Sequence, residues 1–210
     1  MNPLRSTRLL WLLGAAAAAP VLAQVEPPPA FTQSISQSLI GNAALSDVRG
    51  RAAVNVSAGD ANAQSNAAAI AIGLSDASVS AFAGVIQQID ARGSTPPGVA
   101  SATIGDRVFA NAVGMISVNQ TSGLGNAQAN TVAIGVGFEA EVVAESALAT
   151  ATSGIGAAGR PPGSVRHRGA AIADTAFEGA RGLVQVNQSA GSGNSTANNF
   201  ALRVHMGARP

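Results

Sequence analysis

The stretch VNQTSGLGNAQANTVAIGVG at residues 118–137 has two related copies, VNVSAGDANAQSNAAAIAIG at residues 54–73 and VNQSAGSGNSTANNFALRVH at residues 186–205. In each copy a glycine follows the first asparagine after four residues, and further asparagines follow after seven and eleven residues. The first asparagines are Asn55, Asn119 and Asn187, the glycines are Gly59, Gly123 and Gly191, and the later asparagines are Asn62, Asn66, Asn126, Asn130, Asn194 and Asn198. A repeat of turn glycines and amide side chains predicts stacked structural units before it predicts a catalytic site.

Side chains alternate with a period of two in each copy. Behind the glycine, one face carries amides and then aliphatic residues, whereas the other face carries mostly small residues. This period is typical of β-strands, so each copy is predicted to be strand, turn and strand, with the glycine at a positive φ angle. The alanine content would also suit a helix, but the regular glycines and β-branched residues favour strands.

Stacking explains why amides recur at these positions. Identical amide side chains on stacked strands lie about 4.8 Å apart and hydrogen-bond along the stack as a ladder without repelling each other. The predicted ladder residues are the asparagines named above together with Gln64 and Gln128. Aliphatic residues are predicted to pack between layers: Ile70, Ile72, Ile116, Val118, Val132, Ile134, Val186 and Leu202. The predicted fold is all-β, a β-solenoid or cross-β stack with partly disordered linkers.

Similarity at shifts of 64 and 68 residues extends upstream of the quoted copies and divides the chain. We predict three repeats at 40–73, 104–137 and 172–205, the last followed by a tail to residue 210, and linkers at 74–103 and 138–171. Each linker contains Pro-Pro-Gly, at 96–98 and 161–163, where proline interrupts strand pairing. Residues 74–90 and 138–153 could add further strands or helical turns.

The N-terminus is predicted to be a secretory signal peptide, residues 1–23. Arg5 and Arg8 precede an apolar run from Leu9 to Ala19, and Ala23 provides a small residue at the cleavage point. The run is too short for a transmembrane helix, which needs roughly 20 residues. A proline-rich spacer follows at 24–39. We therefore expect a chain that is exported through the periplasm to the cell surface, without a membrane span.

Composition limits the partners of this chain. The chain has 12 basic residues, all arginine, and 11 acidic residues. Removal of the predicted signal peptide would remove Arg5 and Arg8, after which the basic and acidic charges nearly balance. A nucleic-acid partner is therefore not indicated. The chain has no cysteine to form disulfides and few large side chains to form an ordinary globular core. Residues 108–138 contain no charged residue, which predicts that the middle repeat is the strongest assembly core.

The repeats resemble the Fap functional-amyloid subunits of bacterial biofilms, which are exported and have three imperfect repeats joined by two linkers. The Gly-x-x-Asn step is also similar, more weakly, to the repeat of curli subunits. The resemblance implies a biofilm or adhesion fibre whose partner is a second copy of the chain, together with related fibre subunits and an outer-membrane export pore. The chain departs from major Fap subunits, which tend to carry a Cys-x-x-Cys near the C-terminus.

No catalytic, cofactor or metal site is predicted. The two histidines, His167 and His205, lie outside any recognisable motif, and no nucleophile motif is present. Glu139, Glu141 and Glu145 lack the aspartate-rich loop of a calcium site, and we interpret them as a solvated stretch. The alternatives that remain are a monomeric β-solenoid adhesin or other binding module, such as an ice-binding protein, and an enzyme or cell-envelope factor of an unrelated fold.

Overall fold

The computed structural model describes residues 34–73, 78–151 and 166–206, and these residues form eleven β-strands and no helix. The predicted signal peptide, the spacer up to residue 33 and the second Pro-Pro-Gly lie outside the described residues. The strands are β1 (Ile35–Ile40), β2 (Arg49–Ala58), β3 (Ala63–Ile72), β4 (Ser78–Asp90), β5 (Val99–Ile104), β6 (Val113–Leu124), β7 (Ala127–Gly137), β8 (Glu139–Ala151), β9 (His167–Ile172), β10 (Arg181–Ser192) and β11 (Ser195–His205).

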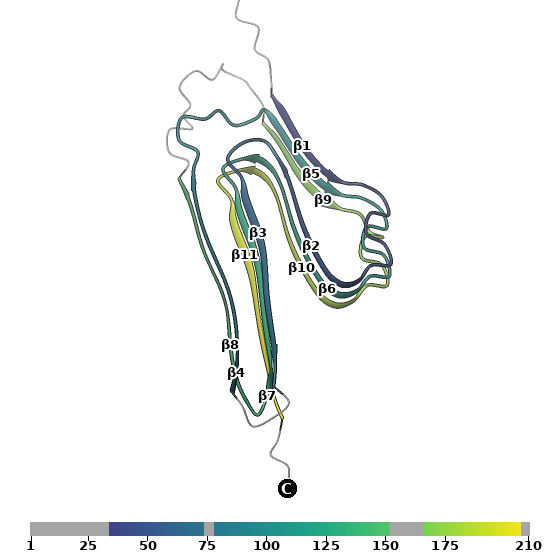
Figure 1. The fold of residues 1–210 in the computed structure, drawn as a ribbon. Helices are drawn as coiled ribbons and strands as arrows, with labels where there is room; N and C mark the ends of the chain where they lie inside the picture. Colours follow the sequence, from purple (N-terminus) through teal and green to yellow (C-terminus); the bar gives the residue numbers. More distant parts are fainter. Residues whose placement is uncertain (1–33, 74–77, 152–165, 207–210) are drawn as a thin grey trace, which may run out of the picture. The chain divides into compact units, whose positions relative to one another are not determined.

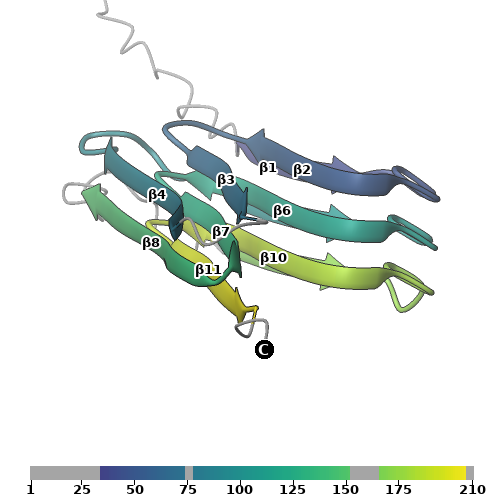
Figure 2. The ribbon, with the colours of Figure 1, turned by 60° about the horizontal axis from the view of Figure 1, so that its bottom comes forward.

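The strands form three layers, which Figure 2 shows one above another. Layer 1 consists of β1 to β4, layer 2 of β5 to β8, and layer 3 of β9 to β11. Equivalent strands of successive layers pair in parallel, which gives the sheets β1-β5-β9, β2-β6-β10, β3-β7-β11 and β4-β8, with the layer-2 strand central in each three-stranded sheet. This architecture confirms the prediction of an all-β stack.

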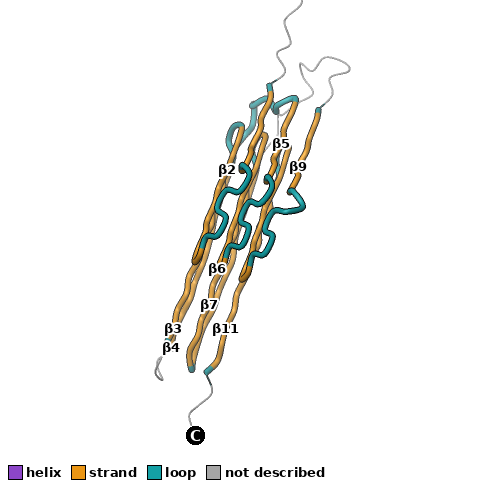
Figure 3. Tube along the Cα trace, turned by 90° about the vertical axis from the view of Figure 1, so that its right-hand side faces the viewer, coloured by secondary structure: helices purple, strands orange, loops and turns teal. Residues whose placement is uncertain are grey.

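The register of the stack follows the sequence repeat. Asn55 pairs with Asn119 and Asn119 with Asn187, and the same shifts of 64 and 68 residues hold along the other two three-stranded sheets. The loops that join the first and second strand of each layer stack as well (Figure 3). In these loops the Ala43 amide donates to the Asp106 carbonyl at 2.8 Å, and the Phe177 amide donates to the Val108 carbonyl at 2.8 Å. Backbone pairing therefore continues from strand to loop.

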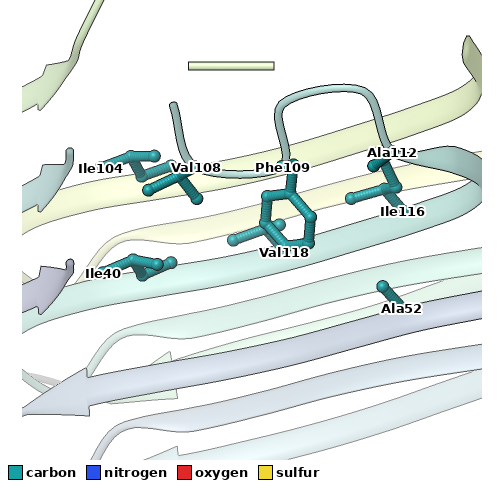
Figure 4. Close-up of a cluster of buried hydrophobic side chains, with 8 residues drawn as sticks. All are labelled: Ile40, Ala52, Ile104, Val108, Phe109, Ala112, Ile116 and Val118. Carbon is teal, nitrogen blue, oxygen red and sulfur yellow. The ribbon is translucent and has the colours of Figure 1, made fainter. Parts of the chain in front are cut away.

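Within a layer, neighbouring sheets are joined through side chains, which pack together or hydrogen-bond to side chains and backbone groups of the next sheet. Figure 1 shows the four sheets face to face in chain order, with β2-β6-β10 and β3-β7-β11 in the middle. Between the first loop and β2-β6-β10 lies the main apolar cluster, which Figure 4 shows and which includes Ile104, Val108, Phe109, Ile116 and Val118. The rings of Phe109 and Phe177 stack with centroids 5.3 Å apart. Large side chains thus gather in one region of the stack.

The small-residue face of β3-β7-β11 packs against the sheet β4-β8. Ala133 lies in one cluster with Ala81 and Ala83, and short side chains allow the two sheets to approach closely. Strands β4 and β8 lie in the segments predicted as linkers, β5 and β9 lie there except for their last residues, and β1 lies in the predicted spacer except for Ile40. The described parts of the linkers therefore consist largely of strands. The sequence left open whether these segments form strands or helical turns, and residues 78–90 and 139–151 form strands.

Candidate functional site

The amide side chains of each layer meet inside the arch formed by its second and third strands. In layer 2, Nδ2 of Asn130 on β7 donates to Oδ1 of Asn119 on β6 at 3.0 Å and to the Val118 carbonyl at 3.1 Å. Both asparagines are 0% exposed. The equivalent contacts recur as Asn66 to Asn55 at 2.8 Å and Asn198 to Asn187 at 3.0 Å. A buried amide without a partner would destabilise the fold, and these amides have partners.

The same residues form ladders along the stack, each donating in one direction from a layer to the layer before it. Nδ2 of Asn119 donates to Oδ1 of Asn55, and Nδ2 of Asn187 to Oδ1 of Asn119, both at 3.0 Å. Asn130 donates to Asn66 and Asn198 donates to Asn130, both at 2.9 Å. The two ladders lie side by side and exchange further bonds, so the interior of the arch is one connected amide network.

A third ladder lies at the turn. Nδ2 of Asn126 donates to Oδ1 of Asn62 at 2.8 Å, and Nδ2 of Asn194 donates to Oδ1 of Asn126 at 2.8 Å. Nδ2 of Asn62 also reaches the Gly123 carbonyl, and Nδ2 of Asn126 the Gly191 carbonyl, each at 3.1 Å. The asparagine of each layer thus binds the turn of the next layer as well as its own equivalent.

Glycine is required at the turn for two physical reasons. Gly59, Gly123 and Gly191 have φ angles of 92, 129 and 135°, which L side chains rarely adopt. A Cβ atom at Gly59 would lie 2.1 Å from the Gly123 carbonyl oxygen, and one at Gly123 would lie 1.7 Å from the Gly191 carbonyl oxygen. The turns therefore stack too closely for any side chain.

The glutamine ladder is shorter than the asparagine ladders. Nε2 of Gln64 donates to Oε1 of Gln128 at 2.8 Å, and Nε2 of Gln128 donates to Oγ of Ser189 at 3.1 Å. Layer 3 carries Thr196 at the equivalent position, and its buried Oγ1 has no hydrogen-bond partner among the described residues. The ladder therefore ends at layer 2.

A further pair of glutamines, which sequence reasoning missed, joins β2-β6-β10 to β1-β5-β9. Nε2 of Gln188 donates to Oε1 of Gln120 at 2.9 Å. Nε2 of Gln120 donates to the carbonyls of Ser38 at 3.0 Å and Thr103 at 2.8 Å. The only available signal was that two of the three copies carry glutamine here, because the first copy carries Val56.

The predicted aliphatic residues fall into two groups. Ile116, Val118 and Val132 are at most 1% exposed, and Ile134 and Val186 are half-buried. In contrast, Ile70 is 57%, Ile72 is 63% and Leu202 is 40% exposed. The second group lies along β3 and β11 beyond the amides, on the face opposite β4-β8.

Charged side chains lie at the outside of the described stack. Glu139, Glu141 and Glu145 project from the exposed face of β8. Arg168 donates to the carbonyls of Pro97 at 2.9 Å and Gly98 at 3.2 Å, and burial, aided by nearby Arg166, lowers its pKa below the ordinary value.

Among the described residues, no three His, Asp or Glu side chains are placed to hold a metal ion together. The same residues include no helix that could cross a membrane.

Residues 18–205 match the family described as functional amyloid protein FapB/FapC. Because this match covers most of the chain, the chain belongs to the FapB/FapC family of functional amyloid proteins. No solved structure matches the chain.

Proposed function

We propose that this functional amyloid protein forms an exported surface fibre by stacking its copies head to tail, with layer 3 of one copy against layer 1 of the next. The fibre would support biofilm or adhesion. Its partners would be further copies of the chain, related fibre subunits that start or cap the fibre, and an outer-membrane export pore. The amide ladders and turn glycines would hold copies together as they hold layers together within one copy.

The observation that carries this proposal is that the two ends of the stack are complementary. At the layer-1 end, Nδ2 of Asn55 donates no hydrogen bond within the described chain. At the layer-3 end, Oδ1 of Asn194 and Oδ1 of Asn198 accept none from the described residues. A second copy in the same register would therefore extend the ladders with the donor direction unchanged. Each new hydrogen bond would contribute about 0.5–1.5 kcal/mol.

One contact would oppose this stacking. Arg49 and Arg181 occupy the same column of β2-β6-β10, separated by Val113. At a junction between copies, Arg181 of one copy would lie about 4.8 Å from Arg49 of the next. Both arginines are exposed, so water and salt would screen their repulsion. The junction between copies is therefore expected to be weaker than a junction between layers of one copy.

Two glycines at opposite ends offer a test of assembly, provided that the strain of an alanine at their φ angles of 102° (Gly50) and 135° (Gly191) is measured separately in the unassembled chain. A Cβ atom at Gly50 would meet nothing within 4 Å in the described chain, and one at Gly191 would come no closer than 3.4 Å to its nearest neighbour. At a head-to-tail junction, however, the Gly191→Ala methyl would collide with the Gly59 carbonyl of the next copy. The Gly50→Ala methyl would collide with the Gly182 carbonyl of the preceding copy, as internal Cβ atoms at Gly59 and Gly114 would collide within one copy.

The experiment compares both variants with the parent chain, each without the predicted signal peptide. The parent should give fibre-diffraction reflections at about 4.7 and about 10 Å. Either variant alone should lose some stability in thermal unfolding because of its positive φ, retain its β-rich circular dichroism, and fail to elongate. Their mixture should form dimers in analytical ultracentrifugation because one intact end of each remains. Gly93→Ala is the control, because Gly93 has a φ of 76° and open space around its Cβ position but lies in the β4–β5 loop.

Two results would contradict the proposal. A parent chain that stays a soluble β-rich monomer would favour the adhesin or binding-module alternative. Normal elongation by both single variants would show that copies do not join through these two ends.

A further inference from the structure

The fourth sheet has one strand fewer than the other three. β4 and β8 pair in parallel from Ser78 with Glu139 to Asp90 with Ala151. Among the described residues, no strand of layer 3 follows β11 to lie beside β8, and Figure 2 shows β8 with its outer edge uncovered. A strand of thirteen residues therefore presents an edge of unpaired backbone groups.

The open edge of β8 lies next to an uncovered part of β11. β4 packs on β3 and β7, and β8 packs on β7 and β11, so the fourth sheet is displaced by about half a layer. Oγ of Ser146 on β8 donates to Oδ1 of Asn199 on β11 at 2.9 Å. Beyond this contact there is a hollow lined by Ala140, Glu141, Val142, Ala201 and Arg203.

Stacking of copies, on which this inference rests, would not close the edge. The next copy starts at layer 1, so its β4 would lie two strand positions from β8, because the described residues of layer 3 form no fourth strand. Paired strands lie about 4.8 Å apart, and these two edges would lie about 9.6 Å apart. They could not hydrogen-bond to each other, and the space between them has the width of one strand.

We propose that this space, the fourth-strand slot between β8 and the next copy's β4, binds one extended strand of another polypeptide in parallel with β8. The chemistry of its walls defines that strand. Its inward positions should be small or β-branched, as Ala81, Ala83, Val142 and Ala144 are in β4 and β8, because the slot lies over Ala201. One inward position should carry a carboxylate to pair with Arg203. Its outward positions should be neutral or basic, because the outward face of β8 is acidic.

A peptide based on β4 serves as the probe, because β4 already pairs with β8 and has the required small residues. The register places Val79 beside Ala140, and Val79, Ala140 and Arg203 line one hollow. A labelled synthetic peptide of residues 78–90 with a Val79→Glu change should therefore bind preformed fibres of the chain, with saturation at about one peptide for each subunit.

Variants test the charge pair and the strand pairing. In fibres of the Arg203→Glu variant, binding of the Val79→Glu peptide should fall about tenfold or more, whereas a Val79→Lys peptide should bind these fibres better than parent fibres. Arg107→Glu, which changes an exposed arginine in the loop between β5 and β6 of layer 2, should leave peptide binding unchanged. A peptide with a further Gly84→Pro change should bind poorly, since proline donates no backbone hydrogen bond.

The controls separate this inference from the proposed function. Absence of cross-β reflections from fibres without peptide would contradict the stacking itself. With such fibres present, binding only at the fibre ends, far below one peptide for each subunit, would overturn the slot. Equal binding of the proline peptide, or the same response to Arg203→Glu and Arg107→Glu, would also overturn it.

Discussion

The middle layer and the outer layers carry the same amides in the same register, yet their environments differ. Asn119, Asn126 and Asn130 in layer 2 are 0% exposed, whereas their layer-1 equivalent Asn55 is exposed and Asn62 and Asn66 are half-buried. A layer-2 amide bonds to layers on both sides, and an outer amide to one. The difference shows that both sides of an amide ladder are covered only inside a stack, so each outer layer keeps amide groups that a further layer could bind.

The largest effect is expected from a charge in the middle layer. Asn130→Asp removes the Nδ2 donor that binds Asn66, Val118 and Asn119 and places a carboxylate among acceptor oxygens in a fully buried site. We expect the free energy of unfolding to fall by about 3–5 kcal/mol in denaturant titration of the unassembled chain. Asn66→Asp, at a half-buried outer position, should destabilise it less. Equal losses would contradict the difference between the layers.

The next effect concerns the close approach of the turns. Gly123→Ala combines an unfavourable φ of 129° with a Cβ position 1.7 Å from the Gly191 carbonyl oxygen. Gly93→Ala has a positive φ but no neighbour within 4 Å. Thermal or chemical unfolding should therefore show Gly123→Ala to be less stable than Gly93→Ala by about 1–3 kcal/mol, the contribution of overpacking. Similar stabilities would mean that the layers separate easily at the turn.

A stabilising change should make layer 3 more like layer 2. Thr196→Gln would place an amide opposite Gln128 and replace a buried hydroxyl oxygen that has no partner among the described residues. Extending the ladder from Gln64 and Gln128 should raise the free energy of unfolding by about 0.5–1.5 kcal/mol. Thr196→Val, which removes the hydroxyl without adding an amide, is the matched control. A gain as large with valine would show that the amide itself contributes nothing.

The smallest effect is expected at the end of β4 in layer 1. The Arg92 guanidinium binds the Asp90 carboxylate and lowers the pKa of that carboxyl from 3.8 to about 2. Because the folded pKa is depressed, the contribution of the pair is present above pH 3.8 and is lost as the pH falls toward about 2. The pair is exposed, so the contribution is small. Asp90→Asn should make the free energy of unfolding less dependent on pH over this range. An unchanged pH dependence would show that the Asp90–Arg92 pair does not stabilise the fold.

Much of the fold could be predicted because its repeats are readable as a register. Glycine and asparagine at equal offsets identified which residues pair along the stack, since a one-residue slip would move every amide to the other face. Gln120 and Gln188 escaped notice because they donate to backbone carbonyls of β1, β5 and β9, and these partner residues lie outside the predicted repeats. For the segments that form β4 and β8, the sequence left the choice between strands and helical turns open.

The sequence by itself determined the two strands and the turn of each repeated copy and the register in which the copies pair, because alternation and repetition are local properties of the chain. Tertiary structure alone decided which faces are covered. Ile116 and Ile70 are both aliphatic and both on β-strands, yet Ile116 is 1% and Ile70 is 57% exposed. Alternation divides a strand into two faces, but burial depends on which other sheet packs there. The same reason applies to the open edge of β8, because an edge is complete or incomplete only with respect to the strand beside it.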